Sequence, residues 1–164
     1  MYYLLMRSYG HVMVWILVML ATGCAGAASA GSPGEVRFEV AETKILIRES
    51  GAIIIGGREV AKLTKGGKVV DSRGQLLAFV NEDSIRLPGG ASLPVKETSD
   101  GALYIPSDPQ TAADLKPVTS RLRKDDTLAQ TQGSRGIPVE GLQNDLSRRV
   151  VLLVLVLMKN NLVQ

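Results

Sequence analysis

Reactive side chains are scarce in this chain and are unevenly distributed. The 164 residues include one histidine, His11, one tryptophan, Trp15, and one cysteine, Cys24. Beyond Cys24 the chain therefore has neither an imidazole nor a thiol. Serine–histidine–aspartate and cysteine–histidine catalysis need those groups, and so do zinc sites built on histidine or cysteine. We expect no enzyme of these classes, no metal site and no cofactor.

The groups that remain for chemistry are carboxylates, lysines, serines and Tyr104. Two pairs of acidic residues, Glu39 with Glu42 and Asp71 with Asp83, are candidates for an acid and a base. Their spacing does not distinguish them from ordinary residues of solvated strands and turns. We therefore predict that the protein is not an enzyme, and we assign no catalytic residue.

The N-terminal segment has the layout of a secretory signal peptide. Residues 1–11 contain Arg7 and no acidic residue, Val12 to Ala21 form an apolar run of ten, and small residues follow. A membrane-spanning helix needs about 20 apolar residues, so this run is short for a permanent span. We predict an export signal over residues 1–23.

The end of this signal resembles the lipobox of bacterial lipoproteins. The residues Leu20-Ala21-Thr22-Gly23 precede Cys24, although the third position before the cysteine is alanine rather than the usual leucine. In that family the cysteine thiol receives a diacylglycerol, and cleavage occurs just before it. The resemblance implies lipidation of Cys24 and a lipid anchor in a membrane. Because Ala25 is not aspartate, it also implies the outer membrane, with the protein facing the periplasm.

A second cleavage site lies in the same stretch. Ala28-Ser29-Ala30 fits an A-x-A site, which would release a soluble periplasmic protein that begins at Gly31. Two features favour the lipid anchor. Cys24 is the only cysteine of the chain, and the small residues from Ala25 to Gly34 suit a flexible tether. We therefore predict a lipidated tether over residues 24–34.

The charge of the chain gives no reason to expect a nucleic-acid partner. The formal net charge is +3, and removal of residues 1–23 deletes only Arg7, which leaves 18 basic against 16 acidic residues, or +2. The densest basic cluster is Arg121, Arg123 and Lys124, and Asp125 and Asp126 follow it at once. A basic stripe with interleaved aromatic residues, which is typical of nucleic-acid binding, is missing.

Residues 35–106 read as short strands separated by glycine turns. Alternating or continuous apolar residues indicate strands, and paired turn residues such as Gly66-Gly67 and Asp100-Gly101 indicate hairpins. The fold class that follows is mainly β, a small antiparallel sandwich or barrel. The expected strands are Val36–Ile47, Ala52–Ile55, Glu59–Leu63, Lys68–Val70, Gln75–Val80, Ser84–Leu87, Ser92–Lys96 and Ala102–Ile105.

A faint internal repeat runs through these hairpins. The spacing from Gly51 to Gly74 is the same as the spacing from the pair Gly66-Gly67 to the pair Gly89-Gly90. This equal spacing hints at duplication of a hairpin. The stretch from Gly67 to Leu77 is also loosely similar to the hairpin units of small secreted β-flower proteins.

The last third of the chain changes character. Residues 107–140 are polar and contain proline, which indicates a linker. In the segment 141–164, Asn144 and Asp145 are helix-cap candidates, and Val150–Met158 is apolar on every side. We favour a helix over a buried strand because of the caps and the length. Its apolar end must be buried, either against the β domain or against a protein partner.

Two functions are compatible with these features. The first is a non-enzymatic scaffold or accessory subunit of an envelope assembly, anchored through Cys24, with a partner bound through Val150–Met158. The alternative is a binding module for an envelope polymer such as peptidoglycan, with a groove lined by Tyr104, Phe79 and carboxylates.

Overall fold

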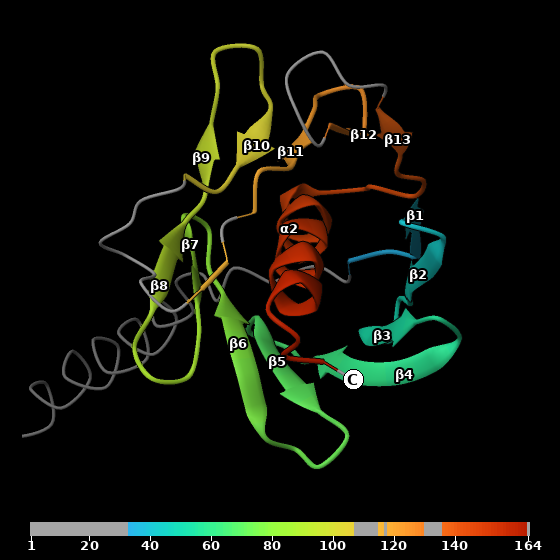
Figure 1. The fold of residues 1–164 in the computed structure, drawn as a ribbon, viewed down its shortest axis with the longest axis vertical. Helices are drawn as coiled ribbons and strands as arrows, with labels where there is room; N and C mark the ends of the chain where they lie inside the picture. Colours follow the sequence, from blue (N-terminus) through green and yellow to red (C-terminus); the bar gives the residue numbers. More distant parts are fainter. Residues whose placement is uncertain (1–32, 107–114, 117, 130–135, 164) are drawn as a thin grey trace, which may run out of the picture.

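The structure is a computed structural model that describes residues 33–106, 115–116, 118–129 and 136–163. The predicted signal peptide, Cys24 and the A-x-A site at Ala28–Ala30 lie outside the described residues. The described chain forms thirteen short strands and one helix, α2 (Figure 1). The tether predicted over residues 24–34 reaches into this part, because Pro33 and Gly34 are already buried.

Short antiparallel strands form two sheets, which confirms the predicted mainly β fold. The first sheet has eight strands in the order of the chain, β1 to β8, and the second has the order β13-β12-β11-β10-β9. Neither sheet closes into a barrel among the described residues. The strands are β1 (Val36–Val40), β2 (Thr43–Ile47), β3 (Ala52–Ile55), β4 (Arg58–Leu63), β5 (Lys68–Asp71), β6 (Leu76–Val80), β7 (Ser84–Arg86), β8 (Ser92–Pro94), β9 (Lys96–Glu97), β10 (Leu103–Tyr104), β11 (Arg121–Leu122), β12 (Thr127–Ala129) and β13 (Ile137–Pro138).

One turn is used repeatedly between these strands. In five hairpins a glycine with positive φ donates its N–H to the carbonyl oxygen of the residue three positions before it. The N–H of that same residue donates to the carbonyl oxygen of the residue that follows the glycine. In the β2–β3 hairpin, for example, Gly51 donates to Arg48, and Arg48 donates to Ala52. The glycine provides the left-handed conformation that the turn requires. The internal repeat is therefore visible in the turns. Gly51 and Gly74, which are one repeat apart, hold the same turn position, and so do Gly67 and Gly90. The five are Gly51, Gly67, Gly74, Gly90 and Gly101.

The single strand expected over Val36–Ile47 is wrong, because the chain turns back at Ala41 and Glu42. These two residues have φ of +48° and +64°, and they join β1 and β2 as a two-residue hairpin loop. Such loops normally contain glycine or asparagine, since L side chains are strained at positive φ. The sequence carries neither residue here, which is why the turn could not be read from it.

The range 107–140, which we expected to be a linker, contains strands. Three strands fall within it, β11, β12 and β13, and they build most of the second sheet. They are two or three residues long, and polar side chains surround them in the sequence. Their pattern is therefore too short to give a periodicity signal.

The expected helix is confirmed as α2, Asp145–Lys159. Asn144 caps its first turn, where its side-chain oxygen accepts the N–H of Ser147 at 2.9 Å and the hydroxyl of Ser147 accepts the N–H of Asn144 at 3.2 Å. This reciprocal capping box satisfies backbone donors that would otherwise lack partners. Asn161, with φ of +52°, follows the last turn.

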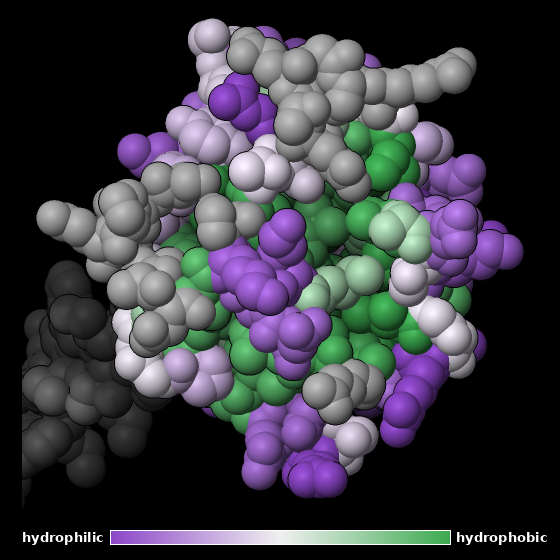
Figure 2. Space-filling model, in the orientation of Figure 1, coloured by the Kyte–Doolittle hydropathy of each residue, from purple (hydrophilic) through white to green (hydrophobic). Residues whose placement is uncertain are grey.

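Helix α2 is the core of the molecule. Every side chain from Val150 to Leu157 is at most 7% exposed, and strands of both sheets surround the helix in Figure 1. A helix that is apolar all round must be buried on all sides, and a curved wrapping of strands achieves this. Figure 2 shows apolar residues across the middle of this face, with a group of hydrophilic residues lying over them and others at the rim. The apolar segment is therefore packed in the protein's own core, which removes our reason for expecting a partner to bind through it.

In the described parts of the chain, one β-bridge joins the two sheets. Arg37 of β1 and Glu140 exchange both backbone hydrogen bonds, with N···O distances of 2.9 and 2.8 Å. At the opposite side, β8 ends at Pro94 and β9 begins at Lys96, so the chain passes directly from one sheet into the other. Within the described part of the chain, no helix is long and apolar enough to cross a membrane.

Candidate functional site

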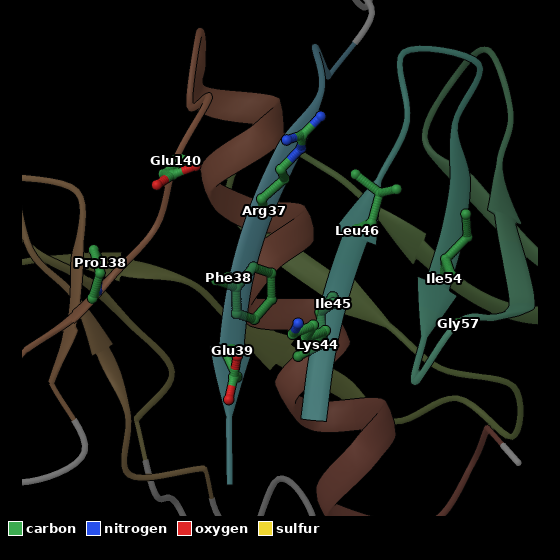
Figure 3. A pocket seen from close by; sticks show the side chains of 10 residues that line it. All are labelled: Arg37, Phe38, Glu39, Lys44, Ile45, Leu46, Ile54, Gly57, Pro138 and Glu140. Atoms are coloured by element: carbon green, nitrogen blue, oxygen red, sulfur yellow. The ribbon is translucent and has the colours of Figure 1, made fainter. Parts of the chain in front are cut away.

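A trough of about 480 Å³ lies on the outer face of the first sheet, beside the bridge between the two sheets (Figure 3). Its walls come from β1, β2, the β3–β4 hairpin and the end of β13. Strand alternation explains its outward-facing residues, Arg37 and Glu39 on β1 and Lys44 and Leu46 on β2, because every second residue of a strand points to the same face. The lining residues are Arg37, Phe38, Glu39, Lys44, Ile45, Leu46, Ile54, Gly57, Pro138 and Glu140.

The floor of the trough carries an apolar pair. Leu46 of β2 lies directly opposite Ile54 of β3, and both are only partly buried on the outer face. Phe38 and Ile45 line the trough too, but their side chains belong to the core, at 6% and 2% exposure. Partly exposed apolar side chains next to a hollow are a common feature of binding sites.

Charged side chains of both signs surround this pair. Arg37 and Lys44 are basic, Glu39 and Glu140 are acidic, and all four are exposed. Glu39 lies opposite Lys44 in the β1–β2 register. Arg37 is held from one side by Glu35, whose carboxylate accepts its Nε–H at 3.0 Å. Because the charges balance, the trough is suited to a ligand with both a positive and a negative group.

The lining of the trough contains no hydroxyl, thiol or imidazole. Its ionisable groups are the carboxylates of Glu39 and Glu140 and the basic groups of Arg37 and Lys44. Across the described residues, no group of three histidine, cysteine, aspartate or glutamate side chains is arranged to hold a metal ion.

The carboxylate pairs named from the sequence have local structural roles. Asp71 accepts the backbone N–H groups of Arg73 and Gln75, both at 2.8 Å, and thereby fixes its own turn. Asp83 accepts the hydroxyl of Ser84 at 3.0 Å. Glu42 forms half of the β1–β2 loop, so it is Glu39 alone of these four that lines the trough.

The aromatic residues expected to line a groove do not line the trough. Tyr104 on β10 stacks with the guanidinium of Arg121, 5.3 Å from the ring centroid. Phe79 lies on β6 opposite Lys68 and Arg86. The sequence suggests Tyr104 and Phe79 only because they are aromatic. The trough instead forms where β1 pairs with β2 and where Glu140 bridges to β1, and neither contact can be read from residue type.

A second polar cluster lies where α2 meets the turns of the second sheet. The guanidinium of Arg148 donates to the carbonyl oxygens of Gly101 and Arg123, at 3.0 and 3.3 Å, and so ties two turns to the helix. Asp100 and Asp125 belong to these turns. The pKa of Asp100 is lowered by the hydroxyl of Thr98, and the pKa of Asp125 by that of Thr127. Hydrogen bonds that favour the charged carboxylates stabilise the turns, so this contribution is lost as the pH falls through these lowered pKa values.

Comparison of the chain with protein-family models, with curated proteins and with solved structures finds no match.

Proposed function

We propose that the protein is a lipid-anchored, non-enzymatic component of the bacterial cell envelope, held at the outer membrane and facing the periplasm. In this role it serves as a scaffold or accessory subunit of an envelope assembly. The observation that carries the proposal is the sequence Leu20 to Cys24, which ends an apolar export signal at the only cysteine of the chain.

The segment between Cys24 and the folded domain supports this arrangement. Pro33 and Gly34 are already buried in the domain, so residues 25–32 separate the thiol from it. All eight of these residues are alanine, glycine or serine, which are typical of flexible linkers. Two or more acyl chains on Cys24 would make the attachment stable, since each buried methylene contributes about 0.8 kcal/mol.

The composition of the domain supports binding rather than catalysis. Its interior is filled by the apolar side chains of α2, and its trough combines charged side chains with an apolar floor. Such a surface suits recognition of a partner, and none of its lining residues supplies a hydroxyl, thiol or imidazole.

Incorporation of a labelled palmitate analogue in a bacterial host tests the anchor, with two variants that separate the cleavage sites. Cys24→Ser removes the acceptor thiol, so we expect complete loss of label. Ala30→Leu disrupts the A-x-A site and keeps the thiol, so we expect label equal to that of the unsubstituted chain. Label that persists in Cys24→Ser would refute the proposal, and so would an unlabelled native chain whose processing is blocked by Ala30→Leu.

A further inference from the structure

Basic and apolar side chains share the outer face of the first sheet where β4, β5 and β6 pair. Lys62 of β4 lies directly opposite Val70 of β5, and Val70 lies opposite Leu76 of β6. Val69, the chain neighbour of Val70, is fully buried in the core, so Val70 points to the outer face. Directly opposed residues share a face, so Lys62 and Leu76 lie on it as well, and Leu76 is 47% exposed.

A second row crosses the same face on β5, β6 and β7. Lys68 lies opposite Phe79, and Phe79 lies opposite Arg86. The chain neighbours of Phe79, Ala78 and Val80, are buried in the core, so the half-buried ring of Phe79 points outward. The two rows together form what we call the basic-apolar face, which consists of Lys62, Lys68, Val70, Leu76, Phe79 and Arg86.

Positive charge dominates this face. Residues 62–86 include five basic and three acidic residues. Asp71 is the one acidic residue of β5, β6 and β7, and its carboxylate accepts two backbone N–H groups of its own turn. The other two acidic residues, Glu82 and Asp83, lie in the turn between β6 and β7.

The cations of the face keep their charge free for a ligand. Among the described residues, no ion pair involves Lys62, Lys68 or Arg86, and all three are exposed. Cations around apolar and aromatic side chains are typical of surfaces that lie on anionic membranes. There the apolar groups enter the headgroup region and the cations contact phosphates.

The predicted tether would keep the domain close to a bilayer. Its residues 25–32 span at most about 30 Å when fully extended. We infer that the basic-apolar face docks on the anionic phospholipid surface of the membrane that holds the acyl chains. Phe79 and Leu76 enter the headgroup region, and the three cations contact lipid phosphates. The inference rests on the proposed lipid anchor for its setting, but the affinity for anionic lipid belongs to the domain itself.

Vesicle sedimentation tests this affinity without the anchor. The protein is the proposed mature chain, residues 24–164, with Cys24→Ser, which keeps every described residue and has no thiol to acylate. We expect it to bind vesicles of equimolar phosphatidylglycerol and phosphatidylcholine at least about tenfold more tightly than vesicles of phosphatidylcholine alone. Added salt should weaken the binding, because it screens charges at an exposed surface.

Matched pairs of lysines locate the contact. Lys62→Gln with Lys68→Gln should weaken binding about 25-fold, since each lysine near an anionic surface contributes about fivefold. Lys44→Gln with Lys124→Gln changes the net charge equally at two exposed lysines, one on β2 and one in the turn before β12. Because neither belongs to the basic-apolar face, we expect this control to change binding by less than about twofold.

A tryptophan probe reports the apolar part of the contact, because residues 24–164 contain no tryptophan. We expect the emission of Leu76→Trp to shift to the blue on anionic vesicles and to be quenched by brominated lipid. Leu46→Trp is the control on β2, which lies on a different side of α2 from β5 and β6 in Figure 1. Its emission should not change.

Three results would overturn the inference. The first is absence of binding to the anionic vesicles at low salt. The second is an equal loss of binding in the two double variants, or equal quenching of the two tryptophans. The third is a dimer of the chain that the Lys62→Gln and Lys68→Gln pair dissociates, since the face would then bind a second copy. The chain in these experiments carries no acyl group, so their failure leaves acylation of Cys24 to be judged separately by palmitate labelling.

Discussion

At the scale of single residues, the turn glycines differ in what surrounds them. Gly67 and Gly74 hold the same turn position and have φ of +81° and +79°. A Cβ on Gly67 would lie 2.3 Å from the carbonyl oxygen of Val80, whereas nothing lies within 4 Å of a Cβ on Gly74. Gly67 is needed for close backbone approach as well as for its conformation, but Gly74 only for its conformation.

We therefore expect Gly67→Ala to destabilise the protein more than Gly74→Ala. The second substitution should cost about 1–2 kcal/mol, the strain of an L-residue in the left-handed region. The first adds a clash with backbone that side-chain movement cannot relieve, so the total should reach about 3 kcal/mol or more. Urea unfolding followed by circular dichroism measures both. Equal midpoints for the two variants would show that the contact with Val80 does not matter.

The residues of the trough illustrate the limit of sequence reasoning at this scale. Residue type makes Glu39 a candidate acid, but its place in the trough comes from the backbone register that sets it two positions from the bridge. In the sequence Pro138 indicates only a linker, and its place beside the trough depends on the long-range pairing of β1 with Glu140. Register between segments so far apart in the chain leaves no local pattern.

At the scale of elements, the helix was predictable because its signals are local. Asn144 as N-cap and the apolar run Val150–Met158 are contiguous in the sequence, and both indicate a buried helix. The β1–β2 hairpin was not predictable, since Ala41 and Glu42 adopt positive φ without glycine or asparagine. Tertiary packing of Val36, Phe38, Ile45 and Ile47 around α2 outweighs the strain of that loop.

This strain makes the β1–β2 loop a site for stabilisation. The double substitution Ala41→Asn and Glu42→Gly introduces the residue pair that prefers such loops. Release of left-handed strain should raise the free energy of unfolding by about 1–2 kcal/mol. Chemical denaturation compares the variant with Ala41→Ser, which leaves Glu42 strained and should change little. A destabilised double variant would mean that the loop is not the two-residue turn described above.

At the scale of the whole molecule, burial decides what the apolar segment does. The sequence leaves two choices for Val150–Met158, its own core or a partner, because hydrophobicity shows that a segment must be buried but not against what. The structure packs it inside a wrapping of strands from both sheets. The β domain and the C-terminal helix expected as separate parts therefore share one core, and the second sheet lies partly in the expected linker.

The position of this domain in the cell depends on the segment that precedes Gly31, and the mass of the mature protein from its native membrane tests that most directly. We predict an N-terminal peptide that begins at Cys24 and carries the additional mass of a diacylglycerol and its acyl chains. An unmodified N-terminus at Gly31, in a protein recovered from the soluble fraction, would contradict the account.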